Sequence, residues 1–151
     1  MITLLDPARI DQVTTFARSV FNEFVAPFNS DEGNLQFNAN TNAEEMRKRI
    51  DEGRSTVFTY VENDKIVGMI AGKSNHISLM FVDAQHHRKG IGRQLFTTYL
   101  THFDPAQVTV NSSIYAIEAY RRLGFVETDV EQIKNGLRYV PMLWTRKEFT
   151  S

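Results

Sequence analysis

The stretch His86-His87-Arg88-Lys89-Gly90-Ile91-Gly92-Arg93 decides the fold, because it places a basic, glycine-containing turn between a strand and a helix. The apolar run from Ile77 to Val82 that precedes it is typical of a buried strand. The segment from Arg93 to Phe103 repeats apolar residues at helical spacing. The first backbone N–H groups of a helix have no partner within the helix and carry partial positive charge. The turn is therefore predicted to bind a phosphorylated cofactor.

Two kinds of residue in this turn favour a phosphate. Gly90 and Gly92 have no side chains, so a phosphate can approach the backbone amides closely. Full positive charges surround the same point, on Arg88, Lys89 and Arg93. A tight strand-to-helix turn with a solvated basic rim accounts for the same residues, so the turn alone does not decide between the two interpretations.

Two well-known phosphate-binding motifs are excluded. A Rossmann turn needs Gly-x-Gly-x-x-Gly, and Leu95 occupies the position of the third glycine. A Walker loop ends in Gly-Lys-Ser/Thr, which is absent here.

A second segment, Ala116-Ile117-Glu118-Ala119-Tyr120-Arg121-Arg122-Leu123-Gly124-Phe125, makes the pattern specific. The turn resembles the acyl-CoA pyrophosphate loop of the GNAT N-acetyltransferase superfamily, Arg/Gln-x-x-Gly-x-Gly/Ala. The second segment resembles the later helix of that family, Ala-x-x-x-Tyr-x-x-x-Gly-Phe. The two motifs occur in the family's order and with about its separation. His87 departs from the pattern, because it stands where Arg or Gln is usual.

The resemblance implies both a fold and an activity. The fold is α/β (α+β), with a mixed, mostly antiparallel sheet of six to seven strands and about four helices on both faces. The activity is transfer of the acetyl group of acetyl-CoA to a primary amine of a small molecule or peptide, by direct attack in a ternary complex. A non-catalytic acyl-CoA-binding or sensor module on the same fold is the alternative. Homodimers are common in the family, and the sequence leaves the oligomeric state open.

The resemblance also implies a set of cofactor-binding residues. In the family, the strand spanning residues 77–82 parts from the strand spanning 107–110, and the pantetheine arm lies in the gap. A backbone N–H near Phe81 or Val82 would stabilise the carbonyl oxygen. Ser113 falls where many relatives have an Asn that binds the arm, and Asn111 could substitute for it. The expected cofactor-binding residues are Phe81, Val82, His87, Arg88, Lys89, Gly90, Ile91, Gly92, Arg93, Asn111, Ser113 and Tyr120.

Two residues are candidates for proton transfer. The family pattern places the hydroxyl of Tyr120 near the cofactor sulfur, where it could protonate the departing thiolate. A half-buried tyrosine with a solvated hydroxyl is the plain alternative. His76 begins the central strand and could act as general base, since an imidazole has a pKa near neutrality. A solvated residue at a strand start is the alternative for His76.

The acceptor site is the least defined part of the sequence. The family commonly places it beside the first helix and the following loop, where Glu23 and Glu32 could bind a cationic amine. Phe28 and Phe37 could line an apolar acceptor pocket in the same region. Surface charge and ordinary packing explain these residues equally well.

Composition narrows the classes of function. The formal net charge is −1, so no overall field attracts nucleic acid or a membrane. There are no cysteines, which excludes disulfides, thiolate metal sites and an acyl-cysteine intermediate. Adjacent histidines rarely converge on one ion, so no metal is expected at His86 and His87. We expect a single domain over residues 1–151 in the cytoplasm, without a membrane span or a secretory signal.

The remaining chain is predicted by periodicity and turn signals. A helix is expected from Ile10 to Phe24, ended by Pro27, followed by a loop over residues 28–40. Thr41 and Glu44 form a capping box for a short helix. Ser112 or Ser113 is expected to cap the helix that carries Tyr120. Strands are expected at 1–5, 56–61, 66–72, 77–82, 107–110, 125–130 and 138–144.

Overall fold

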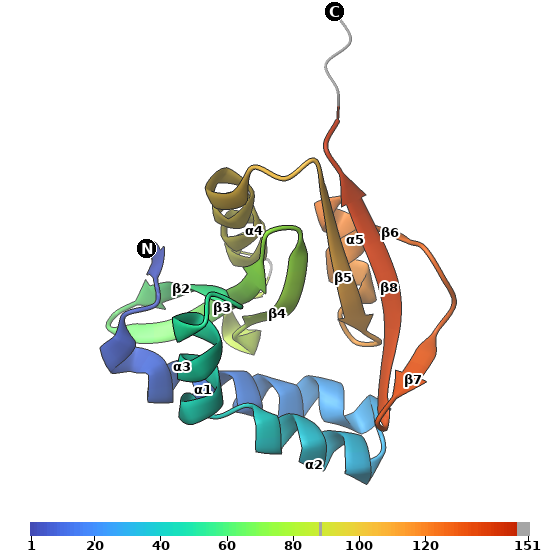
Figure 1. Cartoon of the computed structure of the whole chain (residues 1–151), viewed down its shortest axis with the longest axis horizontal. Coiled ribbons are helices and arrows are strands. Elements are labelled where there is room, and N and C mark those ends of the chain that lie inside the picture. Colours follow the sequence, from blue (N-terminus) through green and yellow to red (C-terminus); the bar gives the residue numbers. More distant parts are fainter. Residues whose placement is uncertain (88, 148–151) are drawn as a thin grey trace, which may run out of the picture.

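The computed structural model describes residues 1–87 and 89–147 (Figure 1). Two 3₁₀ turns (Pro7–Arg9 and Ala26–Phe28) and a π-helical turn (Phe21–Val25) flank and extend the first helix. No helix in the described part of the chain is long and apolar enough to cross a membrane. The helices are α1 (Ile10–Val20), α2 (Asp31–Asn40), α3 (Ala43–Asp51), α4 (Ile91–Phe103) and α5 (Ile117–Leu123). The strands are β1 (Ile2–Leu4), β2 (Thr56–Glu62), β3 (Lys65–Lys73), β4 (His76–Val82), β5 (Gln107–Ser113), β6 (Val126–Glu127), β7 (Gln132–Lys134) and β8 (Leu137–Thr145).

The strands form one mixed sheet in the order β1-β2-β3-β4-β5-β8-β6, with β7 also paired to β8. Among the described residues, β4 and β5 are the parallel pair and every other pair is antiparallel. The sheet has eight strands, where six to seven were expected. The difference arises after Phe125, where the expected strand over 125–130 is reduced to the short β6 and a further strand, β7, forms after a bend. The expected fold class is confirmed.

Helices cover both faces of the sheet. On one face α4 packs on β2, β3 and β4 while α5 packs on β5, and the buried cluster between them is built around Leu95, Tyr99, Val108 and Phe125. On the other face α1 packs on β3, β4 and α3, around Val13, Met46 and Met69 among others. β3 contributes side chains to both clusters, because successive residues of a strand point to opposite faces of the sheet.

The two central strands part soon after they meet. β4 and β5 pair at His76 with Thr109 and at Ile77 with Val110, and the pairing stops there. Beyond that point β4 continues along β3, as far as Val82 opposite Gly68. β5 continues along β8, as far as Ser113 opposite Tyr139. The sheet is therefore open between β4 and β5 on the side where these strands end (Figure 1).

Three local predictions are corrected by the structure. Residues 28–40 were expected to be a loop, but α2 occupies Asp31–Asn40 and is capped by Ser30, whose Oγ accepts a hydrogen bond from the N–H of Gly33 at 3.2 Å. Hydrophobic periodicity does not predict α2, because its few apolar residues do not lie on one side of the helix. The cap of α3 is Asn42, whose side chain accepts from the N–H of Glu45 at 2.9 Å, so the Thr41–Glu44 capping box is wrong.

The third correction concerns the helix that carries Tyr120. Its N-terminal flanking residue is Ala116, and no side chain caps α5 directly. Ser113 Oγ instead accepts from the N–H of Ala116 at 3.2 Å and closes the preceding turn. Ser112 is buried, and its hydroxyl donates to the carbonyl of Ser113.

A contact that we call the clasp joins the start of α2 to the β7–β8 turn. The backbone N–H of Arg138 donates to Asn29 Oδ1 at 2.8 Å, and both the N–H and the hydroxyl of Ser30 donate to the carbonyl of Gly136 at 3.3 Å. Gly33 and Gly136 are in close backbone contact, because a Cβ built on Gly33 would lie 2.4 Å from the carbonyl carbon of Gly136. Figure 1 shows α2 beginning beside the start of β8 and running beneath the parted strands.

Replacing Gly33 with alanine should destabilise the protein by about 1–3 kcal/mol, because the new Cβ overlaps backbone atoms that cannot rotate away. Within an ordinary helix the same change would stabilise by roughly 0.5–1 kcal/mol. The sign of the change in unfolding free energy, measured by urea denaturation, therefore tests the clasp. Leu35→Ala on the exposed side of α2 is the matched control and should change stability little. A stabilised Gly33→Ala protein would contradict the contact.

Candidate active site

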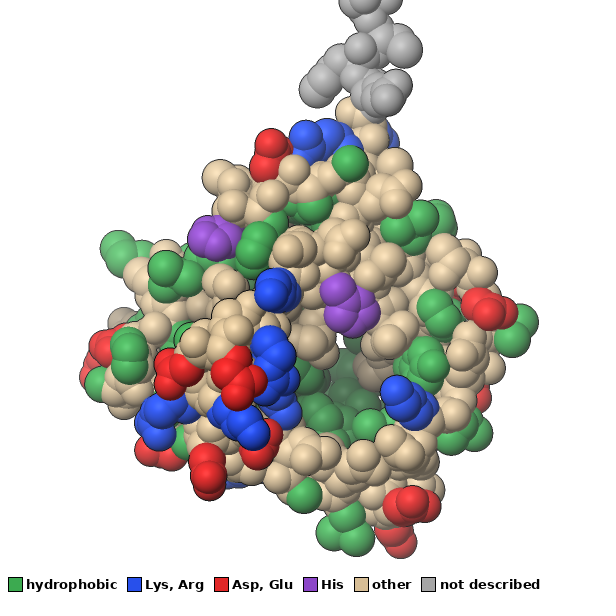
Figure 2. Space-filling model, viewed as in Figure 1, with side chains coloured by type: hydrophobic (Ala, Val, Ile, Leu, Met, Phe, Trp, Pro, Cys, Tyr) green, Lys and Arg blue, Asp and Glu red, His purple; other side chains and the backbone are tan. Residues whose placement is uncertain are grey.

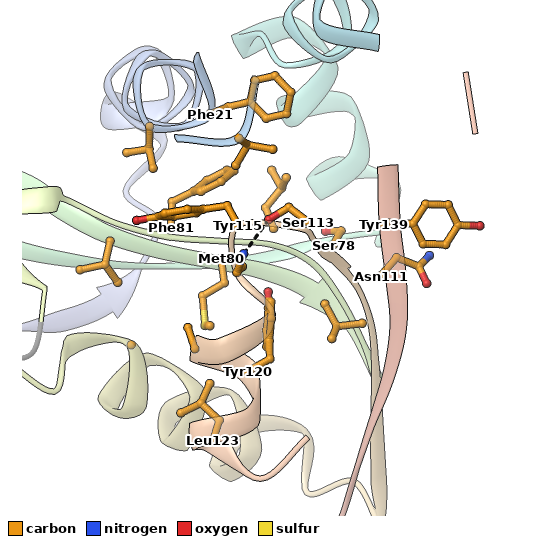
Figure 3. A pocket seen from close by; sticks show the side chains of 18 of the residues that line it. Phe21, Ser78, Met80, Phe81, Asn111, Ser113, Tyr115, Tyr120, Leu123 and Tyr139 are labelled. Carbon is orange, nitrogen blue, oxygen red and sulfur yellow. Dashed lines mark hydrogen bonds between the residues drawn. The ribbon is translucent and has the colours of Figure 1, made fainter. Parts of the chain in front are cut away.

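A cleft of about 750 Å³ lies where β4 and β5 part. Figure 2 shows a hollow with hydrophobic walls on this face of the molecule, and Figure 3 shows the side chains that surround it. Its size falls in the range of small-molecule sites. The β4–α4 turn and α5 form one end, which we call the donor end. The α1–α2 region and the β7–β8 hairpin form the other end, which we call the acceptor end.

The donor end contains unpaired helix amides. Gly90 adopts a left-handed conformation (φ 77°) and directly precedes α4, with no side-chain cap. The first helical hydrogen bond runs from the N–H of Gln94 to the carbonyl of Gly90. The amides of Ile91, Gly92 and Arg93 therefore have no partner within the helix. Gly90, Ile91, Gly92 and Arg93, four of the residues expected to bind the cofactor, all line the cleft.

The charged residues of the turn are placed differently from one another. Arg93 lines the cleft, and its guanidinium donates to the carbonyl of Arg122 at 2.8 Å, which fixes it against α5. Lys89 is exposed and does not line the cleft. Arg88, also expected to bind the cofactor, lies outside the described residues.

The two histidines of the turn line the cleft and are already hydrogen-bonded. His87 Nε2 lies 3.0 Å from the carbonyl oxygen of Val82, so this ring nitrogen donates to the backbone rather than into the cleft. His86 lies between two carboxylates, with Nδ1 2.9 Å from Asp83 and Nε2 2.9 Å from Glu62. Within residues 1–87 and 89–147, no group of three or more His, Asp or Glu side chains is arranged to hold a metal ion.

The open edge of β4 presents backbone amides to the cleft. The N–H of Asp83 donates to Val67 of β3 at 2.8 Å, and successive N–H groups of a strand point to opposite sides. The N–H groups of Val82 and Met80 therefore point away from β3 into the gap, whereas that of Phe81 points toward β3. Of the two residues expected to supply the oxyanion donor, this alternation favours Val82 over Phe81. Both residues line the cleft.

Tyr120 reaches the cleft from α5. Its ring is buried, with 4% of the residue exposed, and packs edge-on against Phe125. Figure 3 shows its hydroxyl pointing from α5 toward β4 and Met80. The hydroxyl makes no hydrogen bond to another described residue. Burial raises the pKa of Tyr120 above the ordinary value of 10.0, so the phenol stays protonated at neutral pH.

The β5 residues of the expected site both line the cleft, but they differ in availability. The hydroxyl of Ser113 is occupied by the N–H of Ala116, as shown by the dashed line in Figure 3. The side-chain amide of Asn111 makes no hydrogen bond to another described residue. Of the two positions that the sequence left open for binding the cofactor arm, the structure leaves Asn111 the freer side chain.

His76 does not line the cleft. It lies at the closed end of the β4–β5 pair, and its Nδ1 is 2.8 Å from the hydroxyl of Thr109. Burial lowers the pKa of His76 below 6.5. His76 stands at the start of β4, as expected, but this end of the strand is remote from the opening.

The three acceptor-site candidates also lie outside the lining of the cleft. Tyr115 lines the cleft, and the pKa of its phenol is raised first by burial and second by the nearby negative charge of Glu23. Phe28 contributes its carbonyl to Arg138 and its side chain is partly exposed. Glu32 is exposed in the first turn of α2. Phe37 does line the cleft, as suggested by the sequence.

The acceptor end contains residues that sequence reasoning missed. Phe21 stacks on Phe37 with ring centroids 3.7 Å apart, and Phe37 meets Phe81 edge-on. Tyr115, which lines the cleft, stacks on Phe24. Lys134, Leu137, Arg138 and Tyr139 complete this end from the β7–β8 hairpin. Nothing in the sequence placed this hairpin beside the start of α2.

Comparisons with known proteins agree with this geometry. A family model described as an acetyltransferase (GNAT) domain matches residues 25–146. A GCN5-related N-acetyltransferase of Rhodopseudomonas palustris is similar in structure (TM-score 0.81, 15% identity, 97% of this chain and 95% of that chain). So is the PaiA N-acetyltransferase of Thermoplasma acidophilum, solved in complex with coenzyme A (TM-score 0.80, 12% identity, 97% and 98%). An aminoglycoside 6'-N-acetyltransferase of Enterococcus faecium gives a TM-score of 0.69 at 15% identity, over 100% and 99% of the two chains.

The family model spans most of the chain, including both sequence motifs and the parted strands between which the cleft lies. The chain belongs to the GNAT acetyltransferase family and is an acyltransferase.

Proposed function

We propose that the chain transfers the acetyl group of acetyl-CoA to a primary amine of a small molecule or peptide, by direct attack within a ternary complex. One observation carries this proposal. The hydroxyl of Tyr120 and the free amides of Met80 and Val82 face the same gap, at whose mouth the N-terminus of α4 lies. The structural similarity to a relative solved with coenzyme A supports the choice of donor.

The donor end suits a diphosphate followed by an extended arm. The amides of Ile91, Gly92 and Arg93 would bind phosphate oxygens, and the charge of Arg93 would add to the helix dipole. The arm would run between β4 and β5, where each strand offers its backbone groups along an unpaired edge. The side chain of Asn111 could bind the arm from β5.

The reaction forms a C–N bond and breaks a C–S bond. The amine nitrogen attacks the thioester carbonyl carbon, and the carbonyl electron pair moves onto oxygen. The N–H groups of Val82 and Met80 would stabilise that negative charge by hydrogen bonding. The electron pair on that oxygen then re-forms the carbonyl double bond, the C–S bond breaks, and the sulfur leaves as a thiolate.

Tyr120 would give its proton to the departing thiolate. A free thiol has a pKa of roughly 8.5, below that of a phenol, so the transfer is unfavourable between free groups in water. The cleft desolvates the thiolate as well and raises its affinity for a proton, which reduces the difference. The phenol has no other hydrogen-bond partner among the described residues to compete for this proton. Water at the open cleft would take the proton that the amine loses and return one to the Tyr120 phenolate.

Tyr120→Phe should lower kcat by about 10²-fold and leave acetyl-CoA binding nearly unchanged, because it removes the acid but preserves the ring packing. Release of CoA thiol with an amine acceptor measures turnover, and a thermal shift with acetyl-CoA measures binding. Tyr60→Phe, in β2 and outside the cleft, is the matched control. Undiminished turnover in Tyr120→Phe would show that another group protonates the thiolate. Binding of acetyl-CoA without turnover of any amine by the unmodified protein would favour a binding module.

The pH profile of kcat provides a separate check on Tyr120. Because burial raises its pKa above 10.0, the phenol retains its proton below that pH and remains able to act as an acid. We therefore expect kcat, measured at saturating acceptor, not to decline as the pH approaches 10.0. A descending limb below that pH that disappears in Tyr120→Phe would contradict the assigned environment.

Gly92→Ala should weaken acetyl-CoA binding by at least about tenfold without destabilising the free protein. The added Cβ would meet only Val82 Cγ2, at an ordinary 3.8 Å, so the fold accommodates it. It would, however, occupy the space through which a phosphate approaches the α4 amides. Isothermal titration with coenzyme A measures the effect, and Thr97→Ala on the exposed side of α4 is the control. Equal affinity in both variants would mean that the diphosphate binds elsewhere.

A further inference from the structure

We propose that the acceptor is a compact amine that carries its own carboxylate beside an apolar body, that is, an apolar or aromatic amino acid. This inference depends on the proposed function, because it identifies the substrate class of the same cleft. It is drawn from the charges, the apolar walls and the closure of the acceptor end.

The charges at the acceptor end do not suit a polycation. None of the described residues that line the cleft is Asp or Glu, whereas Lys134 and Arg138 both line it. Two carboxylates lie nearby without lining the cleft. The guanidinium of Arg138 donates two hydrogen bonds to the carboxylate of Glu131, at 2.8 and 3.0 Å. Glu23 lies next to Tyr115. A cationic acceptor would therefore meet no unpaired carboxylate along the cleft wall.

Lys134 is the cation at this end that is available to a ligand. The contact with Glu131 neutralises Arg138, and Arg138 also donates to the carbonyl of Phe28 at 3.0 Å. Lys134 makes no ion pair with another described residue, and it stands at the end of β7 on the rim of the cleft. An ammonium group in this position attracts a carboxylate and repels a second amine.

The walls next to Lys134 are apolar and aromatic. The stacked rings of Phe21 and Phe37 line this end from the π-helical turn and α2, and Leu137 and Tyr139 contribute from β8. Such a surface gains free energy by burying an apolar side chain. Strongly hydrated acceptors such as polyamines and aminoglycosides would lose hydration here without an anionic partner.

The clasp favours a compact acceptor. The hydrogen bonds of Asn29 and Ser30 with the β7–β8 turn connect the two walls of the acceptor end, and the Gly33–Gly136 contact leaves no space between them. A peptide lying across the cleft would have to break these bonds. A single amino acid can enter with its amine toward the thioester and its carboxylate toward Lys134.

The test compares acceptors that differ in one feature, with acetyl-CoA as donor and CoA thiol release as the readout. L-Phenylalanine should be acetylated with a kcat/KM at least about fivefold above that of 2-phenylethylamine, which lacks the carboxylate. Spermidine, kanamycin and a peptide with N-terminal phenylalanine should be poorer acceptors than either. A best rate with any of these three would overturn the inference, as would a lack of reaction with every amine although acetyl-CoA binds.

Variants at Lys134 test the assigned contact. Lys134→Gln should raise the KM for L-phenylalanine about fivefold and leave that for 2-phenylethylamine unchanged, and Lys134→Arg should restore it. Lys134→Glu should raise the rate with spermidine, because the charge now matches. Lys48→Gln, the same loss of charge on α3 away from the cleft, is the control. An unchanged KM in Lys134→Gln would refute the contact.

The two levels of proposal fail in different ways. If acetyl-CoA gives no thermal stabilisation of the unmodified protein, the proposed donor is wrong and the acceptor inference fails with it. If acetyl-CoA binds and a polyamine or aminoglycoside is acetylated fastest, the donor and the reaction stand and the acceptor class alone is refuted.

Discussion

The unpaired backbone between β4 and β5 is the constraint on which the rest of the site depends. Buried N–H and C=O groups need partners, and two neighbouring strands normally provide them for each other. Here the pairing ends after Ile77 and Val110, so the ends of both strands expose donors and acceptors to the space between them. Without a neighbouring strand, such groups need water or a ligand as partners, and a ligand that runs like a strand can pair with both edges. The opening in the sheet is thus both an energetic liability and the reason that the protein can bind an extended arm.

The elements around the opening keep it from closing. β4 is held by β3 and β5 by β8 along their whole lengths, so neither strand can shift sideways without breaking its other ladder. On one face the gap is supported by Tyr120 of α5 and by Phe125 just after that helix, and on the other by Phe21 of the π-helical turn and Phe37 of α2. Aromatic rings suit this task because they fill volume with few rotatable bonds.

The donor end could be predicted from the sequence because its determinants are local. Gly90, Gly92 and Arg93 lie within one turn, and the backbone amides they expose follow from helix geometry alone. Tyr120 lies beside the cleft for a similar reason, because the helix motif fixes its spacing from Gly124. The general base could not be predicted from local sequence signals. His76 was considered because of its chemistry, but the point where β4 and β5 part lies after it, and no local signal marks that point.

The acceptor end could not be predicted, because it is made by tertiary contacts between distant segments. Lys134 and Tyr139 appear in the sequence as parts of an ordinary hairpin, and the stacking of Phe21 on Phe37 requires α2, a helix without an apolar stripe. Glu23 and Glu32 were plausible by region, yet the turn of the helix directs them away from the cleft lining. Of the residues that the sequence offered for this region, Phe37 lines the cleft and Glu23, Phe28 and Glu32 do not.

The clasp also has a consequence for folding. Ser30 and Gly136 are separated by 106 residues, so the bond between them closes a loop that includes most of the chain. Ordering so long a loop costs entropy that only the previously assembled sheet can offset, and contacts of high sequence separation form slowly. The wall that we assign to the acceptor is therefore expected to assemble last and to open first under denaturing conditions, while the segment from β2 to α4, built from neighbours in the sequence, holds its structure.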